Sequence, residues 1–356
     1  MSKIKVAIAG IGNVASALIQ GVYYYRNVDD NALVPGVRAV RLGGYHIGDL
    51  EFVAAFEVDK RKVGKKLNEA IYAPPNNTPK FFDVPKIDVT VQRGPLLDGL
   101  GKYSSELVPV SKEPEVNVAD VLRDSGADIL VNLLPVGSEN ATKAYAQAAL
   151  DAGVAFINGI PVFVASNENW QKKFSEAKIP VAGDDVQSQV GATVVHKTLV
   201  KLVADKGIKI LNSYQLNIGG NLDFYNMLER GRLSSKEISK TEAVQKMLPY
   251  HVPLKIGPSD YVPALSDTKV CYMRIEGQQW GELPMSIELK LKVNDSPNSA
   301  GVLVDVIRAV KIALNRQVGG PLISVSAFAF KHPPVHAPYD IALEWFDEFI
   351  QGKRER

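Results

Sequence analysis

Residues 4–25 read "IKVAIAGIGNVASALIQGVYYY" and decide the fold class. The first six residues form a short, mostly apolar run that predicts a buried β-strand. The glycines then predict a tight turn. Val14, Leu18 and Val22 recur at helical spacing after that turn, so the whole stretch predicts strand, turn and helix.

The turn itself has the pattern Gly10-x-Gly12-x-x-Ala15, which is typical of dinucleotide binding. The first glycine permits a sharp turn, and the second lets the backbone approach a pyrophosphate. The small third residue lets the helix pack closely on the strand, with its N-terminus facing the phosphates. We therefore predict that the cofactor binds at Gly10, Gly12, Asn13, Val14 and Ala15.

Helices then alternate with apolar strands as far as residue 185, as in "DILVNLLP", "SENATKAYAQAALDAG" and "VAFINGIP". This rhythm predicts an α/β, Rossmann-like doubly wound parallel sheet. Ligands of such sheets bind at the carboxyl ends of the strands. The further cofactor residues predicted there are Leu134, Pro135, Gly137, Ser138, Asp184 and Asp185.

The acid expected on the cofactor ribose normally follows the glycine turn by about 20 residues. Here the candidates are Glu57 and Asp59, after an insertion at 26–48. A carboxylate favours NAD, because it would repel the 2′-phosphate of NADP. The basic residues Lys60 and Arg61 follow directly and would attract that phosphate, so NADP remains an alternative cofactor.

The composition bounds the class of protein. The chain has 356 residues, enough for two lobes, and a formal net charge of +2, which gives no support to nucleic-acid or membrane-surface binding. Its single cysteine, Cys271, excludes an internal disulfide and a cysteine-rich zinc site. We see neither a signal-peptide layout nor a long apolar run, so we expect a cytoplasmic protein.

After about residue 194 the pattern changes to alternating polar and apolar residues, as in "IKILNSYQLNIGG" and "MSIELKLKVND". Such alternation predicts half-exposed antiparallel strands and an inserted α+β lobe. We predict a nucleotide-binding domain over 1–193, a catalytic and tetramerisation domain over 194–298, and a return to the first domain over 299–356. The helix at 299–319 fits that return.

Four lysines of the second half have unusual neighbours. Lys236 and Lys240 lie in "SSKEISKTE", Lys269 in "SDTKV", and Lys331 at the end of the apolar run "AFAFK". Burial or a neighbouring cation lowers the pKa of a lysine and makes it a usable base. Each alone is more simply a surface residue, but together they suggest a site for an anionic substrate.

At this point the sequence resembles a known family. "GIGNVASALIQG", "VNLLPVGSE", "GDDVQSQVGAT", "NIGGNLDFYNML", "SSKEISKTEAV", "YVPALSDTK" and "VNDSPNSAGVLVD" are similar to blocks of myo-inositol-1-phosphate synthase in its shorter prokaryotic form. The blocks follow in order from about residue 4 to 334.

The resemblance implies an isomerase that converts glucose 6-phosphate to myo-inositol 1-phosphate, also named the 3-phosphate. NAD oxidises C5 of the sugar, C6 loses a proton, the enolate attacks the C1 aldehyde, and the C5 ketone is reduced again. It also implies a homotetramer. A divalent or monovalent cation is a further expectation, with Asp295 as the residue that could hold it.

The resemblance also implies roles for single residues. Lys236 moves a proton at the C5 hydroxyl, Lys331 stabilises the ketone and enolate oxygen, and Lys240 and Lys269 hold the phosphate. Asp295 and Asp305 match acidic positions near the nicotinamide and the lysines. The substrate-binding residues are expected to be Ser188, Gln189, Asn217, Asn221 and Asp223.

Some features stay open or depart from the family pattern. Glu57 stands where an aspartate is expected, and Gln187 where a lysine is usual. The lysine helix can begin at either of two capping boxes, Ser234-x-x-Glu237 or Ser239-x-x-Glu242. His332 and His336 have the spacing of metal ligands, but the prolines of "HPPVH" exclude a helical turn, so the sequence gives a metal site little support.

Two other functions compete with the synthase. A net NAD(P)-dependent dehydrogenase of a small aldehyde or semialdehyde would share the glycine turn but would release reduced cofactor. A non-catalytic nucleotide sensor would tolerate loss of Lys236 or Lys331.

Overall fold

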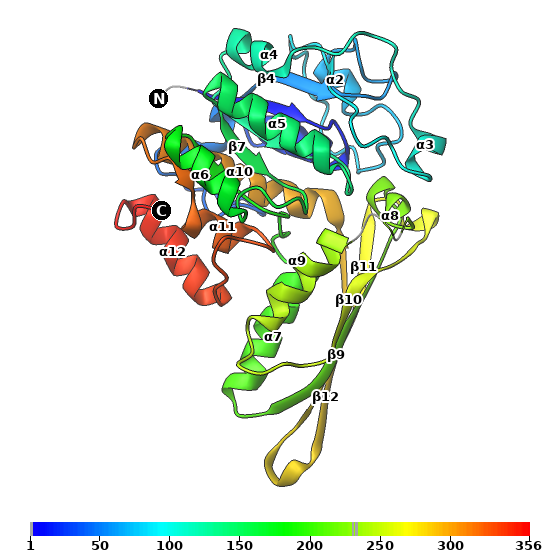
Figure 1. Ribbon diagram of the computed structural model, residues 1–356, viewed down its shortest axis with the longest axis vertical. Coiled ribbons are helices and arrows are strands. Elements are labelled where there is room, and N and C mark those ends of the chain that lie inside the picture. The colour runs from blue at the N-terminus through cyan, green and yellow to red at the C-terminus, as the bar shows by residue number, and fades with distance from the viewer. Residues whose placement is uncertain (1–2, 230, 232–233) are drawn as a thin grey trace.

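The computed structural model describes residues 3–229, 231 and 234–356, and the side chains of residues 234–237 lie outside what it describes. An upper body is built on a parallel sheet, and a long, narrow extension hangs below it (Figure 1). Along the described chain, the upper sheet has seven strands in the spatial order β13 (Gly320–Pro321), β8 (Pro180–Ala182), β7 (Ala155–Asn158), β6 (Ile129–Asn132), β1 (Ile4–Ala9), β4 (Leu50–Glu57) and β5 (Gln92–Arg93).

All pairs of this sheet are parallel, which confirms the predicted Rossmann-like fold. The strand order reverses between β1 and β6, and ligands of such sheets bind at the carboxyl ends beside this reversal. The alternating side chains of β1 supply two cores. Ile4, Val6 and Ile8 join one cluster, and Ala7 and Ala9 join the other.

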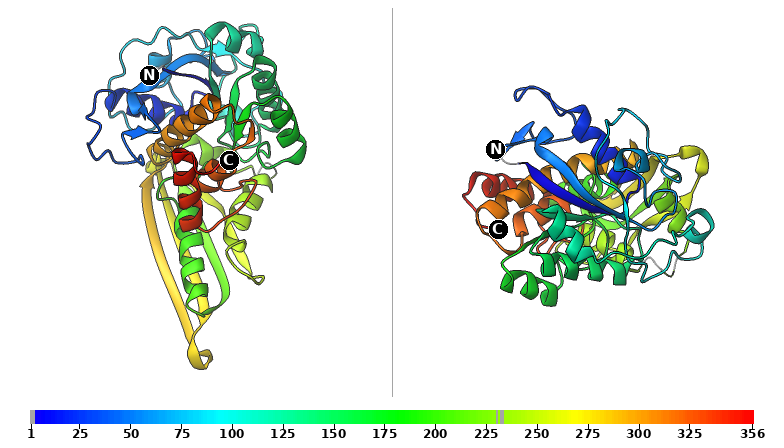
Figure 2. Two further views of the ribbon diagram at one scale, coloured as in Figure 1. Left: turned by 90° about the vertical axis from the view of Figure 1, so that its left-hand side faces the viewer. Right: turned by 90° about the horizontal axis from the view of Figure 1, so that it is seen from above.

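Helices cover both faces of the sheet (Figure 2). One face carries α4 (Val118–Ser125), α5 (Glu139–Ala152) and α6 (Glu168–Glu176), and the other carries α1 (Asn13–Tyr24) and α10 (Asp295–Asn315). The short elements of the upper body are α2 (Leu67–Ala70), α3 (Ser104–Leu107) and the hairpin of β2 (Arg41–Leu42) and β3 (Tyr45–His46).

The return helix α10 begins and ends earlier than the predicted 299–319. It begins early because the carboxylate of Asp267 accepts the amide of Ser296 at 3.3 Å. It ends early because Gln317 has φ +57°, a left-handed conformation through which a right-handed helix cannot continue. The chain then adds β13 to the sheet edge and closes with α11 (Ile323–Ala329) and α12 (Tyr339–Gln351).

The extension is a sheet with helices on one face (Figures 1 and 2). Its four described strands run in the order β10 (Leu254–Tyr261), β9 (Lys209–Gly219), β11 (Thr268–Gln278) and β12 (Pro284–Asn294). The helices are α7 (Ala192–Asp205) and α9 (Ser234–Gln245), with the short α8 (Leu222–Asn226) at the upper end. As predicted, β9, β11 and β12 are antiparallel neighbours. None of the described helices is long and apolar enough to cross a membrane.

Arg308 of α10 holds the insertion at 26–48 in place by hydrogen bonds. Its side chain is fully buried and donates to the carbonyl oxygens of Ala39 and Val40 at 3.0 and 2.8 Å. It also pairs with Asp305 at 2.5 Å. A buried arginine that satisfies several carbonyl groups holds an insertion that has little regular structure besides the short hairpin β2–β3.

We predict that Arg308→Leu destabilises the protein by about 3–5 kcal/mol, because the Asp305 carboxylate would stay buried without its partner. Urea unfolding followed by circular dichroism measures the change. The control is Arg123→Leu, which removes an exposed arginine paired with Asp120 and should cost less than about 1 kcal/mol. Equal losses in both variants would contradict the assigned role.

Candidate active site

The two glycines of the dinucleotide turn have different structural roles. Gly10 has φ +89°, and a Cβ on it would lie 2.6 Å from the carbonyl oxygen of Leu133. Only glycine fits there. Gly12 precedes α1, and a Cβ on it would meet nothing within 4 Å. The protein therefore needs Gly10 for its own backbone, whereas Gly12 leaves open space at a helix N-terminus, where anions bind well. Ala15 is fully buried, as the packing argument requires.

Glu57 lies directly under this turn. Its Oε2 accepts the amide of Ile11 at 3.0 Å. Lys62, which is 3% exposed, donates from Nζ to the carbonyl oxygen of Ile11 at 2.8 Å and lies 3.7 Å from Glu57 Oε2. The sequence did not single out Lys62, because it is one of several basic residues after β4.

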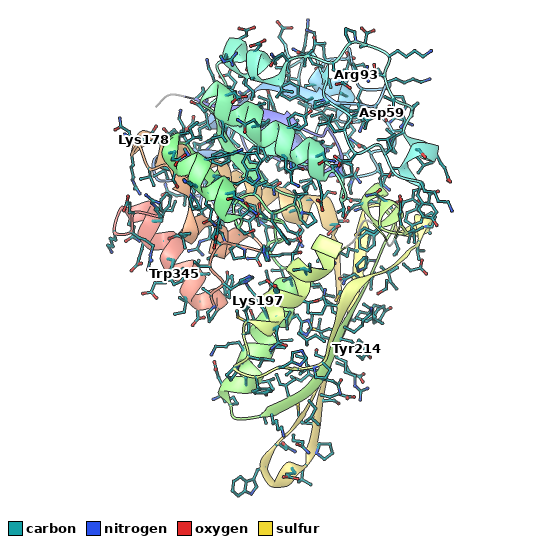
Figure 3. The ribbon with its side chains drawn as sticks, viewed as in Figure 1. Asp59, Arg93, Lys178, Lys197, Tyr214 and Trp345 are labelled. Atoms are coloured by element: carbon teal, nitrogen blue, oxygen red, sulfur yellow. The ribbon has the colours of Figure 1, made fainter. Side chains whose placement is uncertain are left out.

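Asp59 contacts groups of the protein itself, and its role as a cofactor residue stays a prediction. It is fully buried, and its Oδ1 accepts the backbone amide and Nε of Arg61 at 2.8 and 2.9 Å. Its backbone pairs with Val110. Figure 3 shows Asp59 in the upper body, on the side where Arg93 also lies. Glu57 is the acid at the end of β4 whose side chain contacts the glycine turn.

A loop that the sequence left unassigned joins the turn to the extension. Asn13 accepts the backbone amide of Asn77 at 2.8 Å and donates from Nδ2 to Asn77 Oδ1 at 2.8 Å. Asn77 in turn donates to the carbonyl oxygen of Gly220 at 3.1 Å. The second contact between the lobes is made after β6, where Val136 packs on Phe224 and accepts Asn226 Nδ2 at 2.8 Å. The predicted cofactor residues around Val136 lie in this loop: Leu134, Pro135, Gly137 and Ser138.

Asp184 and Asp185 follow β8 and have opposite surroundings. Asp184 is fully buried and accepts Asn158 Nδ2 at 2.7 Å and the Ser166 hydroxyl at 2.8 Å. Burial raises the pKa of Asp184 to about 6, although these hydrogen bonds oppose the shift. Asp184 therefore holds the turn at 164–166, and its role as a cofactor residue stays a prediction.

Asp185 joins the two lobes. Its backbone has φ +62°, a conformation that aspartate tolerates better than most residues. Its Oδ1 accepts Lys331 Nζ at 2.7 Å, and its Oδ2 accepts the hydroxyl of Ser239 on α9 at 2.6 Å. Lys331 also donates to the carbonyl oxygen of Val186 at 2.8 Å. A single carboxylate therefore ties the lysine helix to the segment that carries Lys331.

The other predicted lysines approach the same region. Lys240 is buried on α9 next to Ser239. Lys269 on β11 lies 3.3 Å from Asp295 Oδ1. Burial raises the pKa of the Cys271 thiol to about 11, and the positive charges of Lys269 and Lys240 oppose that rise. Both ammonium groups are thus close enough to Cys271 to act on one thiol.

Lys236 lies on α9, which begins at Ser234. Lys236 and Lys240 are therefore one turn apart on it, and the helix does not begin at the second capping box. The side chains of the first capping box lie outside the described residues. The side chain of Lys236 lies outside the described part of the structure.

Polar residues at the start of α10 and α8 complete the group of side chains around Asp185. Asn221 caps α8, accepting the amide of Phe224 at 3.2 Å, and donates to Asp267 and Asp295 at 3.0 and 3.4 Å. Burial raises the pKa of Asp267. Asp223 follows in the first turn of α8.

Two predicted residues face elsewhere. Gln189 packs between Gly36 and Gly301, where a Cβ on Gly301 would lie 2.4 Å from Gln189 Nε2. Asp305 lies ten residues beyond Asp295 on α10, about 15 Å along the helix axis, and accepts the amide of Arg38 at 2.9 Å besides its pair with Arg308. The side chains of Gln189 and Asp305 thus both contact the insertion at 26–48, and their roles as substrate and catalytic residues stay predictions. Ser188, by contrast, stays near Asp295, since its hydroxyl lies 2.9 Å from that of Ser299.

Buried polar side chains form a hydrogen-bonded network that includes Asn217. The Oδ1 of Asn217 accepts Gln215 Nε2 at 3.3 Å. His196 on α7 lies 3.2 Å from Gln215 and, through Nε2, 2.7 Å from the Ser213 hydroxyl. Burial lowers the pKa of His196 to about 4. Its neighbour Lys197, labelled in Figure 3, is also buried, and burial lowers its pKa to about 8. The sequence pointed to neither residue as part of the site.

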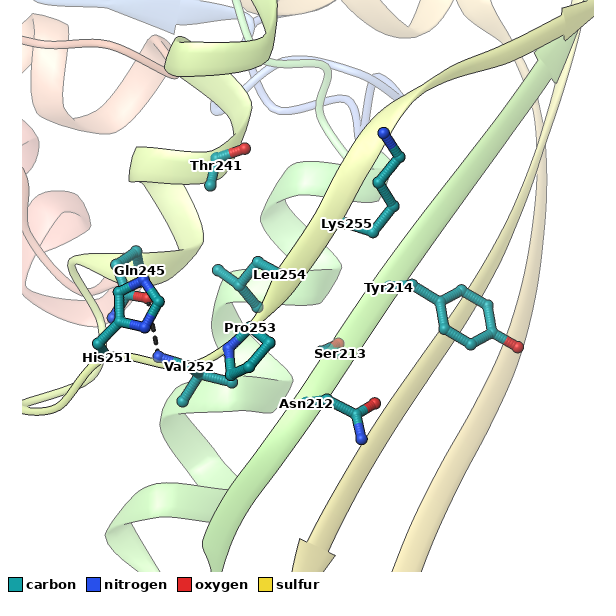
Figure 4. A pocket seen from close by; sticks show the side chains of 10 residues that line it. All are labelled: Asn212, Ser213, Tyr214, Thr241, Gln245, His251, Val252, Pro253, Leu254 and Lys255. Atoms are coloured by element: carbon teal, nitrogen blue, oxygen red, sulfur yellow. Dashed lines mark hydrogen bonds between the residues drawn. The ribbon is translucent and has the colours of Figure 1, made fainter.

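A cavity of about 510 Å³ opens on the extension, between α9 and the strands β9 and β10 (Figure 4). Its lining includes Tyr214, Thr241, Gln245, His251 and Lys255, and none of the predicted site residues. The candidate active site is therefore the group around Asp185, at the carboxyl ends of the upper strands.

Comparison with known proteins decides the family. Residues 191–296 match the family description "Myo-inositol-1-phosphate synthase". The inositol-3-phosphate synthase of Mycolicibacterium smegmatis is 52% identical over 98% of both chains. This chain belongs to the myo-inositol-1-phosphate synthase family. Among solved structures, Ari2 is 35% identical over 99% of both chains with a TM-score of 0.79. A synthase-related protein of Thermotoga maritima is 28% identical over 98% of both chains, with a TM-score of 0.82.

The family membership confirms the resemblance that the sequence suggested. It also fits the observed α/β fold with a separate sheet domain. It does not favour the competing interpretation as a net dehydrogenase, because the relatives are named as synthases of inositol phosphate.

We predict that the stability of the protein falls in acid partly through His196. The unfolded histidine binds a proton near pH 6.5, whereas the folded one does so only near pH 4. The contribution of His196 is therefore intact above pH 6.5 and is lost as the pH falls toward 4, by up to about 1.4 kcal/mol per pH unit.

Urea unfolding at several pH values in this window measures the effect. His196→Gln should have a flatter pH dependence than the wild type, and His251→Gln, which changes an exposed histidine, should not. Parallel curves for the wild type and His196→Gln would contradict the prediction.

Proposed function

We propose that this chain converts D-glucose 6-phosphate to 1L-myo-inositol 1-phosphate, which is 1D-myo-inositol 3-phosphate, in a redox-neutral isomerisation that uses NAD as a recycled cofactor. The observation that carries the proposal is the meeting of Asp185, Lys331 and α9 at the carboxyl ends of a Rossmann-like sheet, in a chain that is 52% identical to a synthase of this name.

The residues at the turn fit a dinucleotide. Gly12 and the N-terminus of α1 leave open space for the pyrophosphate, and Glu57 is the acid nearest to the turn. The loop 134–138 would flank the nicotinamide end, because it lies between the turn and α8. When bound, NAD would accept a hydride from the sugar and return it, which no side chain can do.

The residues around Asp185 suit the proton steps. Lys331, fixed by Asp185 and the carbonyl oxygen of Val186, would stabilise negative charge on the ketone and enolate oxygen. Lys236 would take and return the proton of the C5 hydroxyl. Ser239 would orient Asp185 and thereby Lys331. Fixed charges of this kind act strongly because they need no rearrangement during the reaction.

The phosphate would bind on the other side of this group. Lys240 and Lys269 supply the positive charge, and Ser188 and Asn221 supply neutral hydrogen-bonding groups nearby. Asp295, which pairs with Lys269 at 3.3 Å, would position that ammonium group. With Asp267 next to it, Asp295 is also where an activating cation would bind.

We also propose the division into three segments, 1–193, 194–298 and 299–356, and a homotetramer formed through the extension. The support is that helices cover only one face of the lower sheet (Figure 2). On this sheet Leu216 and Tyr272 are paired neighbours, 39% and 41% exposed. Exposed apolar pairs of this kind are common at interfaces.

The proposed activity is tested by phosphorus NMR of the protein with glucose 6-phosphate and NAD. We predict a new phosphomonoester signal of inositol phosphate without net NADH. Lys331→Met should lower kcat by about 10²–10⁴. The control is Lys311→Met, which removes a half-buried lysine that pairs with Asp128 at 2.7 Å, at the amino ends of the strands. Unchanged substrate, or net NADH, would contradict the proposal.

The cofactor site is tested with the two glycines. Gly12→Val should keep the unfolding free energy close to that of the wild type, because a Cβ at this position meets no protein atom within 4 Å, but should weaken NAD binding in calorimetry by more than about tenfold. Gly10→Ala should destabilise the fold by more than about 1 kcal/mol. Full NAD affinity in Gly12→Val would contradict the assigned site.

A further inference from the structure

Three metal-ligating side chains meet beside the lysine site. Glu242 comes from α9, and His332 and His336 come from the loop after Lys331. Their ligand atoms all lie within 4.8 Å of one another. Within the residues described, this is the one group of three or more His, Cys, Asp or Glu side chains that comes so close. The spacing of the two histidines along the chain did not reveal it, because the third ligand comes from a different element.

His332 is held in place before any ion binds. Its backbone exchanges two hydrogen bonds with Asp184, both 3.0 Å, and its ring stacks on Phe163 with the centroids 4.1 Å apart. Its Nδ1 is buried and makes no hydrogen bond within the described residues. The nearest acid is Glu242, with Oε2 at 3.4 Å from Nδ1. An unsatisfied buried nitrogen that faces a carboxylate is a feature that needs a partner.

His336 completes a geometry that suits a tetrahedral ion. Its ring is nearly perpendicular to that of His332, at 78° with centroids 5.7 Å apart. Pro333 and Pro334 stiffen the loop between them. Metal–ligand bonds of about 2.1 Å in a tetrahedron place the ligand atoms about 3.4 Å apart. The pair of His332 and Glu242 already has this separation, and the ligand atom of His336 lies within 4.8 Å of both.

The surrounding charges do not prevent binding. Lys197 and Lys246 act on His336. Lys246 also acts on His332, where the negative charges of Glu242 and Asp185 oppose it. Lys246 is exposed and therefore screened by solvent. Lys197 is the buried lysine whose charge opposes an ion most strongly.

We propose that Glu242, His332 and His336 bind one divalent transition-metal ion of the zinc class, with water as the fourth ligand. Two imidazoles and one carboxylate are a ligand set that zinc favours when one position stays open. The ion would tie α9, with Lys236 and Lys240, to the segment that carries Lys331. The proposed reaction does not require this ion, so the inference goes beyond that function.

The probe is Co²⁺, added to the full-length protein after chelation and followed by its visible absorption. We expect one equivalent to bind with the intensity of a tetrahedral site. His336→Asn and Glu242→Gln should weaken binding by more than about 100-fold, and Lys197→Met should strengthen it. Asp295→Asn, which alters the candidate cation site near the phosphate, and His251→Asn should leave the spectrum unchanged. Circular dichroism verifies that each variant is folded.

Hydrogen exchange of the wild type gives a second measurement that does not depend on the variants. Zn²⁺ should slow amide exchange in α9, and His336→Asn should abolish this effect. The proposal is overturned if Co²⁺ does not bind, if binding is the same in wild type and His336→Asn, or if Asp295→Asn rather than His336→Asn removes it. It is also overturned if Zn²⁺ leaves the exchange of α9 unchanged.

Discussion

The carboxylate of Asp185 is the contact on which the candidate site depends. It lies at the end of β8, accepts Lys331 from the returning C-terminal segment, and accepts Ser239 from the helix of the extension. Three parts of the chain that are far apart in sequence are thereby held together at one point. A buried carboxylate with two strong donors restricts both partners to a narrow range of positions. Lys331 and α9 can then act on one small substrate.

This arrangement explains why the second lobe is inserted rather than appended. The extension begins at α7 and ends at β12, and α10 then returns directly to pack against α1. Asn77 and Val136 of the upper body bind Gly220 and Asn226 of the extension at the same edge. The upper body carries the glycine turn, Asp185 and Lys331, and the extension carries Lys236, Lys240 and Lys269. Neither lobe contains all of the predicted site residues.

The sequence predicted the parts of the structure that follow from local patterns. The glycine turn, the parallel sheet and three strands of the extension were correct, because hydrophobic period and turn residues specify them directly. The strand β10 was missed, since Gly257 and Pro258 interrupt its pattern. The sequence also could not show which contacts each of two consecutive aspartates makes. Asp184 and Asp185 differ by one residue, yet one supports a turn and the other binds Lys331. The contacts of Asp305 and Gln189 with the insertion at 26–48 could not be predicted either, because only the fold decides which way a side chain on α10 or before α7 faces.

The central claim is that Ser239 acts through the carboxylate of Asp185, which also binds Lys331, and a double-mutant cycle on kcat/KM tests it most directly. The variants are Ser239→Ala, Asp185→Asn and the double mutant. For each, phosphorus NMR under single-turnover conditions measures the rate at which inositol phosphate forms. If Ser239 acts through Asp185, the double mutant will be no worse than Asp185→Asn alone. If the two losses multiply in full, Ser239 and Asp185 act independently and the account of the site is wrong.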